Sequence, residues 1–422
     1  MDDRWLESGK ITKWASKGGW AIADQSFFAG ANFLAGVQVA RWLSLSDFGA
    51  FSTAYSIFLF VSTFYTALWI EPMLLYGSGV FQESLHSYFL KIRRLHWYFS
   101  LLVAFCFAIA AMIMADTGWD NLASALMGLV VATPLVLFLW LMRRYCYVIL
   151  KPQLATLGGG FYLIFYLSGI YLVHRLDWLT SMNVFIVMGI ASFFASLVII
   201  RMALTVPADE DVVAVREIIH QHWRYGRWAI LASGFWWVPS NLPYILLPLM
   251  LDFDASAILR AFYYLVMPVL QISLALGSLF LPTYTRLRNT PRLRFALLVS
   301  GVSLGGLALL YWLLLVTLGE PVVEFLYAGR YVKYLALINI IGFLPVFVAL
   351  GSVFSNFLRS VERPDLVAWA YGIGAVSVII IIYPLVMRSG IQGAALSWLI
   401  GQFLMFAFLF VASMRILSKG RS

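Results

Sequence analysis

The sequence predicts an all-α polytopic membrane protein with twelve transmembrane helices, arranged as two six-helix lobes related by a pseudo-two-fold axis. Of its 422 residues, 62% are hydrophobic and only 12% are charged, whereas soluble domains carry about 25% charged residues. The mean hydropathy is +0.87. Apolar runs of about 20 residues, the length that crosses a bilayer as a helix, recur along the chain.

The predicted spans begin close to the N-terminus and follow one another with short connections. The first apolar run is too long for the apolar core of a cleavable signal peptide, so it is expected to be the first span. The twelve spans are expected at residues 18–40, 49–76, 96–115, 121–142, 153–173, 180–200, 228–251, 256–283, 295–318, 334–358, 365–387 and 391–414.

The basic residues predict which side of the membrane each loop faces. Of the 29 lysines and arginines, 23 fall in the N-terminal arm, in every second loop and in the C-terminal tail. Because cytoplasmic loops are enriched in Lys and Arg, both termini are expected in the cytoplasm. The net charge of +9 reflects this asymmetry, and no nucleic-acid partner is expected.

The longest inner loop divides the predicted spans into two sets of six. In that loop Val212, Val215, Ile219 and Trp223 share one helical face, which predicts a helix lying in the membrane interface. The expected organisation is a cytoplasmic arm (1–17), an N-lobe (18–200), a cytoplasmic linker (201–227), a C-lobe (228–414) and a cytoplasmic tail (415–422).

Polar side chains inside the spans are candidates to line a cavity between the lobes. An ionisable group in the membrane is a functional candidate by default, which singles out Asp24, Glu71 and Arg260. Prolines around Asn241 free backbone carbonyls, which are tolerated at depth only against protein or a wet cavity. The candidate substrate-binding or cavity residues are Asp24, Gln25, Asn32, Glu71, Asn241, Arg260, Tyr264 and Gln271.

A structural interpretation of the same residues stays open. Side chains such as Asn32 also join membrane helices by hydrogen bonds, and Asp252 and Asp254 are candidate ion-pair partners for Arg260. No metal site, catalytic set or cofactor is expected, since the five histidines are scattered. His220 and His222 point in different directions on a helix.

Several segments occur in the order found in one family. They are "SDFG" (46–49) after the first span, "GRY" (329–331) in an outer loop, "RP" (363–364) before the eleventh span and "SGIQGAALSW" (389–398) at the last. Together they resemble bacterial polysaccharide flippases of the multidrug/oligosaccharidyl-lipid/polysaccharide (MOP) exporter superfamily. The sequence departs from that pattern at Asn241, where members often carry an aspartate, and at "IEPMLLYG" (70–77), where they often carry Asp-x-Gly.

The resemblance implies a monomeric alternating-access transporter of the bacterial inner membrane, not an enzyme. Its expected substrate is an undecaprenyl-pyrophosphate-linked oligosaccharide, an O-antigen or exopolysaccharide repeat unit. Its expected partners are membrane lipid and other polysaccharide assembly proteins, and a coupling ion, Na⁺ or H⁺, stays open. Capture of the pyrophosphate at the cytoplasmic mouth is expected from Lys17, Arg93, Arg94, Arg143, Arg144, Arg224 and Arg227.

Other functions remain open. A multidrug or cation-coupled small-molecule exporter of the same superfamily shares the fold. A membrane-embedded polysaccharide polymerase needs a long outer loop or a positioned acid–base set, and the sequence predicts neither.

Overall fold

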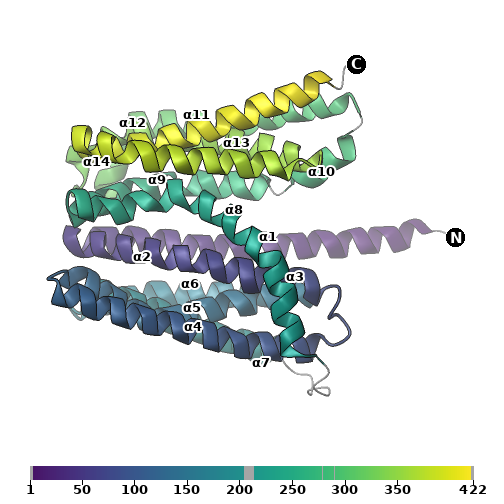
Figure 1. Ribbon diagram of the computed structural model, residues 1–422, viewed down its shortest axis with the longest axis horizontal. Coiled ribbons are helices and arrows are strands. Elements are labelled where there is room, and N and C mark those ends of the chain that lie inside the picture. Colours follow the sequence, from purple (N-terminus) through teal and green to yellow (C-terminus); the bar gives the residue numbers. More distant parts are fainter. Residues whose placement is uncertain (1–2, 204–212, 278, 289, 420–422) are drawn as a thin grey trace. The chain divides into compact units, whose positions relative to one another are not determined.

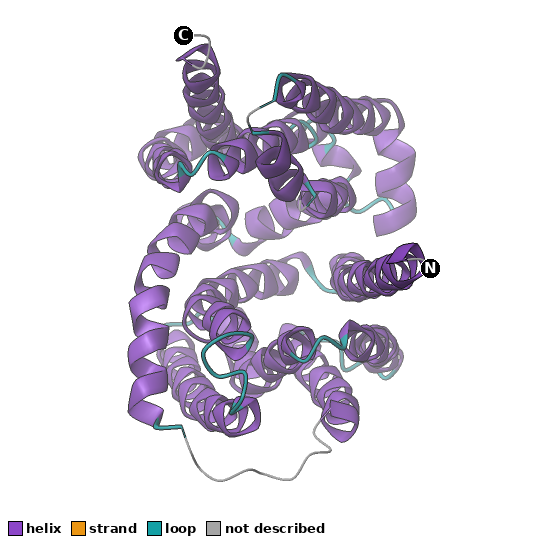
Figure 2. Ribbon diagram, turned by 90° about the vertical axis from the view of Figure 1, so that its right-hand side faces the viewer, coloured by secondary structure: helices purple, strands orange, loops and turns teal. Residues whose placement is uncertain are grey.

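The computed structural model describes residues 3–203, 213–277, 279–288 and 290–419, with only the backbone course for 3–17 and 419. Every regular element within these residues is a helix, and none of them forms a strand (Figures 1 and 2). The all-helical class expected from the sequence is therefore confirmed.

The chain divides into two compact units. Unit 1 comprises Met1–Ala35 and Ile57–Leu231, and unit 2 comprises Gly36–Ser56 and Ala232–Ser422. The boundaries fall inside three helices, α1 (Asp3–Trp42), α2 (Leu45–Tyr65) and α8 (Val215–Met250). The units thus differ from the expected lobes, because the end of α1 and the start of α2 belong to unit 2.

Unit 1 is built around a central helix that packs against three others (Figure 1). Its helices are α4 (Leu85–Asp116), the central α5 (Asp120–Val148), α6 (Pro152–Arg175) and α7 (Ser181–Ala203). Glycines bring α5 and α7 close together, since a Cβ on Gly128 would lie 2.6 Å from the Met182 carbonyl oxygen and one on Gly189 2.9 Å from Ala132 Cα. Such small residues allow the close backbone approach typical of membrane helices.

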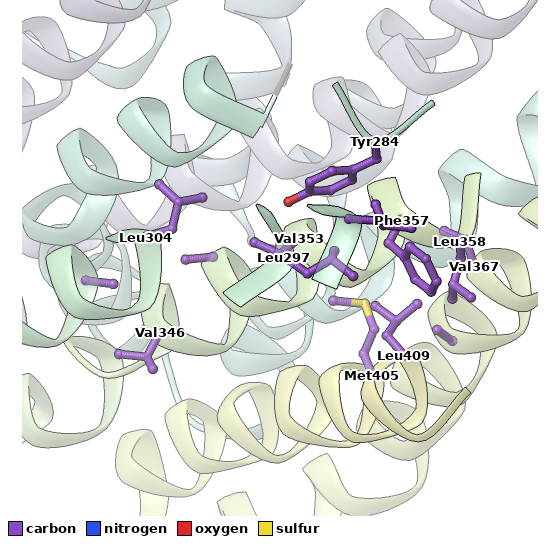
Figure 3. Close-up of a cluster of buried hydrophobic side chains, with 14 residues drawn as sticks. Tyr284, Leu297, Leu304, Val346, Val353, Phe357, Leu358, Val367, Met405 and Leu409 are labelled. Carbon is purple, nitrogen blue, oxygen red and sulfur yellow. The ribbon is translucent and has the colours of Figure 1, made fainter. Parts of the chain in front are cut away.

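Unit 2 has a core of buried side chains contributed by four of its helices. Figure 3 shows Tyr284, Leu297, Phe357 and Met405 gathered in this core. The helices of unit 2 that follow α8 are α9 (Phe253–Gly277), α10 (Phe280–Leu287), α11 (Arg292–Tyr327), the single 3-10 turn η2 (Val332–Tyr334), α12 (Leu337–Ile341), α13 (Leu344–Ser360) and α14 (Pro364–Lys419).

Nine helices in the described part of the chain are long and apolar enough to cross a membrane. One of them is α14, in which Gly390 has φ 56° and interrupts the helical backbone between the two last predicted spans. The predicted spans 18–40 and 228–251 lie in α1 and α8, which are outside the nine. The polytopic class is supported, while the number twelve and the side of the termini stay predictions.

The second predicted span is one continuous helix with a wider turn near its end. The order is α2, then the π-helical turn η1 (Thr66–Ile70), then α3 (Glu71–Gly77), with Pro72 in the first turn of α3. Proline lacks an N–H and disturbs the helical ladder on its N-terminal side. The π-helical turn lies directly before Glu71 and Pro72.

Two of the segments that carry the family resemblance, "SDFG" (46–49) and "GRY" (329–331), lie at helix ends in unit 2. Ser44 accepts the Asp47 N–H at 3.0 Å and so caps α2. A Cβ on Gly49 would lie 1.8 Å from the Phe253 carbonyl oxygen, so only glycine fits there. Arg330 donates to the Leu43 carbonyl at the end of α1. These segments act structurally, by closing helix ends and allowing helices to touch.

Candidate functional site

The centre of the candidate site is Arg260, which lies in α9 and is 3% exposed. Its Nη2 donates to the Ser52 carbonyl oxygen at 3.0 Å and to Ser56 Oγ at 2.5 Å. Both serines lie in α2, one helical turn apart, and all three residues belong to unit 2. The Ser56 hydroxyl also donates to the Ser52 carbonyl at 2.9 Å, which places one hydroxyl and one backbone carbonyl side by side against the guanidinium.

Aromatic rings enclose the same guanidinium. Its carbon lies 3.5 Å from the ring centroid of Tyr244 and 5.8 Å from that of Tyr55. Tyr263 packs against Trp398 of α14, with ring centroids 5.3 Å apart. A cation over an aromatic face is attracted by the ring quadrupole, and the attraction grows where water is excluded.

No carboxylate neutralises Arg260 among the residues that the structure describes, where the ion pairs join other partners. Asp252 instead accepts the Ala255 N–H at 2.8 Å and caps α9. Arg260 Nε and the Tyr244 hydroxyl are buried and have no hydrogen-bond partner among the described residues. A buried charge without a counter-charge is costly, so unit 2 holds a guanidinium suited to receive an anion.

The other candidate residues in unit 2 differ in burial and in their contacts. Tyr264 is 5% exposed and packs on Gly36, where a Cβ would lie 2.3 Å from the ring. Asn241 Nδ2 donates to the Trp237 carbonyl at 3.4 Å within its own helix. Gln271 is exposed. Tyr264 and Asn241 are thus both buried, and Tyr264 follows Arg260 by one turn of α9.

Asp24 occupies a separate position in unit 1. Its Oδ1 accepts from Arg143 Nε at 2.9 Å, and its Oδ2 accepts from Tyr147 at 2.8 Å. The guanidinium of Arg143 lies 4.0 Å from the ring centroid of Phe28. Asp24 is fully buried and Arg143 is 6% exposed. This pair joins α1 to α5, so Arg143, expected at an open mouth, is engaged by a buried carboxylate.

The remaining α1 candidates differ in their surroundings. Asn32 donates to the Phe28 carbonyl at 2.8 Å and accepts from Tyr162 at 3.2 Å. Gln25 is exposed. Asn32 thus makes the helix-joining contacts of the structural interpretation, whereas Gln25 is open.

Glu71 faces the first turns of α8 within unit 1. Tyr225 donates to Glu71 Oε2 at 3.2 Å. Burial and then the Glu71 carboxylate raise the pKa of Tyr225 to about 12, so the phenol remains a donor. The structure thus places the neutral Tyr225 hydroxyl at the Glu71 carboxylate.

His222 binds the same bent segment. Its Nδ1 lies 2.7 Å from the Leu68 carbonyl oxygen and its Nε2 lies 2.7 Å from the Tyr88 hydroxyl. A carbonyl only accepts, so Nδ1 carries the proton and Nε2 accepts from Tyr88. Gly226 completes the contact, since a Cβ there would lie 2.8 Å from the Ala67 carbonyl oxygen. We call His222, Tyr225 and Gly226 the α8 clasp.

Known structures resemble this chain along nearly its whole length. One is an inward-facing multidrug resistance MATE family transporter of the MOP superfamily, with a TM-score of 0.78 and 14% identity, covering 94% of this chain and 96% of that one. Another is the lipid II flippase MurJ in an inward closed conformation, with a TM-score of 0.71 and 14% identity, covering 93% and 87%. The chain has the MOP-transporter fold.

A third structure with the MOP-transporter fold comes from Pyrococcus furiosus and is described as having a binding pocket of reverse polarity. Its TM-score is 0.66 with 12% identity, and the match covers 96% of this chain and 95% of that one. By sequence, no protein-family model and no curated protein matches the chain. The likeness at these identities concerns the fold.

In this MOP-transporter fold the expected capture residues differ in accessibility. Arg94, Arg224 and Arg227 are exposed, while Arg93 and Arg144 are half-buried. The Arg144 guanidinium lies 5.6 Å from the Tyr147 ring centroid. The side chain of Lys17 lies outside the described part. The structure therefore leaves Arg94, Arg224 and Arg227 freely accessible, all within unit 1.

Sequence reasoning missed residues that complete these sites. Ser52 and Tyr244 lie beside Arg260, and Tyr88 lies beside His222. Ser56, a polar residue inside a span, was a usable signal, whereas Ser52 contributes its backbone carbonyl, which the side chain at that position does not reveal. The tyrosines gave none, since aromatic residues are common throughout the spans.

Proposed function

We propose that the protein is a membrane transporter whose substrate carries a pyrophosphate, as a lipid-linked oligosaccharide does. The observation that carries this proposal is the buried Arg260 guanidinium without a carboxylate partner. A planar guanidinium matches phosphate oxygens bidentately, which a lysine cannot do. The unpaired Nε–H and Tyr244 hydroxyl add two more polar groups for an anion.

The substrate class follows from three chemical needs. A sugar cannot cross hydrocarbon without polar contacts, a pyrophosphate needs cations, and a polyprenyl tail needs lipid. The MOP-transporter fold supports transport between leaflets, and one solved structure with this fold is named a lipid II flippase. We therefore assign the chain to flipping of an undecaprenyl-pyrophosphate-linked oligosaccharide in the bacterial inner membrane, with both termini cytoplasmic.

Export of a cationic small molecule is the second candidate, because several solved structures with this fold are MATE transporters. A binding site for a cation needs an available anion. In unit 1 the carboxylate of Asp24 is neutralised by Arg143, whereas the half-buried Glu71 accepts a hydrogen bond from the neutral Tyr225 and is the carboxylate that a cationic substrate would use. In unit 2 the buried charge is positive, and this charge favours an anionic substrate.

The test is polymer export in cells that depend on this transporter. Arg260→Lys keeps the positive charge but loses the planar guanidinium that binds phosphate bidentately, and it is expected to retain partial export. Arg260→Ala is expected to abolish export while the protein level stays normal. The matched control is the double variant Asp252→Asn/Asp254→Asn, which removes the aspartates near the start of α9 and is expected to leave export unchanged. Full export by Arg260→Ala contradicts the proposal, as does a double-aspartate variant that behaves like it.

A further inference from the structure

The first turns of α8 present an apolar stripe that is partly exposed in the described structure. Val215, Ile219 and Trp223 recur every fourth residue and are 36%, 46% and 55% exposed. At 3.6 residues per turn the stripe is centred about 60° round the helix from the clasp position His222. The helix is thus fixed to unit 1 by the clasp, and the stripe borders its His222 and Tyr225 side, while Gly226 continues the direction of the stripe two turns beyond Ile219.

Arginines follow on the far side of the stripe. Arg216, Arg224 and Arg227 are all exposed, and Glu217 is the single acidic residue between Val215 and Leu231. The guanidinium of Arg227 lies 5.5 Å from the ring centroid of Trp228, which is 66% exposed. An apolar stripe edged by arginines and tryptophans is the pattern of a helix lying among lipid headgroups.

We propose that this face of α8, defined by Val215, Ile219, Trp223 and the three arginines, binds anionic phospholipid headgroups of the leaflet on the basic side of the protein. The charge of the arginines favours anionic over uncharged lipid. Each arginine near an anionic surface increases the affinity about fivefold, and three together increase it on the order of a hundredfold. Position supports the choice, because α8 runs on from this face into the span predicted from residue 228. The inference does not rest on the proposed substrate.

Lipid binding to this face of α8 also affects the contacts between α8 and the second predicted span. The clasp residues His222, Tyr225 and Gly226 hold η1 and α3 from the adjoining side of the same helical turns. Lipid binding that fixes the position of α8 therefore also stabilises the contacts of the clasp. An anionic leaflet is expected to stabilise the bent end of the second span.

The test places a fluorescent label at Ile219→Cys in a Cys106→Ser background, since the other cysteine, Cys146, is buried. The protein is reconstituted as single copies in nanodiscs of phosphatidylglycerol or of phosphatidylcholine. Quenching of the label from water by the uncharged quencher acrylamide is expected to be several-fold weaker in phosphatidylglycerol. The triple variant Arg216→Gln/Arg224→Gln/Arg227→Gln is expected to lose that protection.

A matched control removes three other exposed arginines, by Arg286→Gln, Arg292→Gln and Arg415→Gln, and is expected to keep the protection. Equal quenching in both lipids overturns the proposal, as does protection that survives the α8 triple variant. Protection that appears only with two copies in one disc also overturns it, and assigns the face to self-association.

Discussion

The Leu68 carbonyl oxygen, four residues before Pro72, lies 2.7 Å from Nδ1 of His222. Residues Thr66–Ile70 form a π-helical turn in which the Glu71 N–H bonds the Thr66 carbonyl, and Pro72 has no N–H to donate. Buried backbone acceptors are nearly always paired. The imidazole of α8 donates to one of the carbonyls of this irregular turn.

Acid is expected to weaken this contact. Burial lowers the pKa of His222 to about 4 from the usual 6.5, against the opposing effect of the Leu68 carbonyl. Between these values the unfolded chain binds a proton that the folded protein excludes, so stability falls as pH drops through this window. The melting temperature in detergent, measured from pH 7.5 down to 5, tests this.

The control for the acid effect is His222→Phe, which keeps an aromatic ring without a titratable group. Its melting temperature is expected to be lower than that of the native protein at pH 7.5 but to change less with pH. An identical pH slope in both proteins assigns the acid effect to other groups.

Gly226→Ala is expected to destabilise unit 1. Its Cβ would lie 2.8 Å from the Ala67 carbonyl oxygen and 2.9 Å from Leu68 Cδ2, and overpacking of this kind costs about 1–3 kcal/mol. Gly234→Ala in the same helix is the matched control, because nothing lies within 4 Å of its Cβ. At position 234 the replacement of glycine by alanine raises the helix propensity, which stabilises the helix by up to about 1 kcal/mol. Equal effects on the melting temperature contradict the close approach of α8.

Asp24→Asn is expected to cost about 3–5 kcal/mol, because it leaves the buried Arg143 without its counter-charge. Replacing both members, as in Asp24→Leu/Arg143→Met, removes the charges together and is expected to recover most of the loss. The readout is the melting temperature and the amount of protein in the membrane. A double variant less stable than Asp24→Asn contradicts a mainly structural pair.

Glu71→Gln is expected to reduce polymer export while protein levels stay normal, if its carboxylate takes part in transport. Tyr225→Phe removes the hydrogen bond seen at 3.2 Å and leaves the carboxylate in place. We expect Tyr225→Phe to keep most export. If Tyr225→Phe loses as much export as Glu71→Gln, the hydrogen bond between Tyr225 and Glu71 is what export requires, and a separate role of the carboxylate is contradicted.

The sequence predicted what hydrophobic patterning controls. The helical class and many helix bounds follow from apolar runs; residues 121–142 and 153–173, for example, lie inside α5 and α6. Asp24, Glu71 and Arg260 were identified as unusual because an ionisable group in lipid is costly.

Pairing between distant residues could not be predicted in the same way. Arg143 belongs to a basic cluster that is typical of a cytoplasmic loop, and nothing local shows that it lies against Asp24, 119 residues earlier. Likewise Pro72 indicates an irregular turn, but the imidazole that donates to the Leu68 carbonyl lies 154 residues away. Tertiary contacts decide such partners, and one sequence carries no record of them.

Stability separates the two roles of Arg260. A buried charge kept for a ligand is unfavourable in the empty protein, and apolar replacement of buried charges is often neutral or stabilising. Arg260→Met is therefore expected to retain or raise the melting temperature while losing export. A drop of several kcal/mol in the free energy of unfolding contradicts this, and makes the bonds to Ser52 and Ser56 the reason for the arginine.

The most direct measurement is the binding of undecaprenyl pyrophosphate to the purified protein, followed by the shift in melting temperature. A ligand at about 100 times its Kd stabilises the folded protein by about 2.7 kcal/mol. The native protein is expected to show such a shift with the pyrophosphate and none with uncharged undecaprenol, and Arg260→Gln is expected to bind at least tenfold more weakly. An unchanged affinity in Arg260→Gln, or an equal shift with undecaprenol, contradicts the assignment of Arg260 as the pyrophosphate-binding residue.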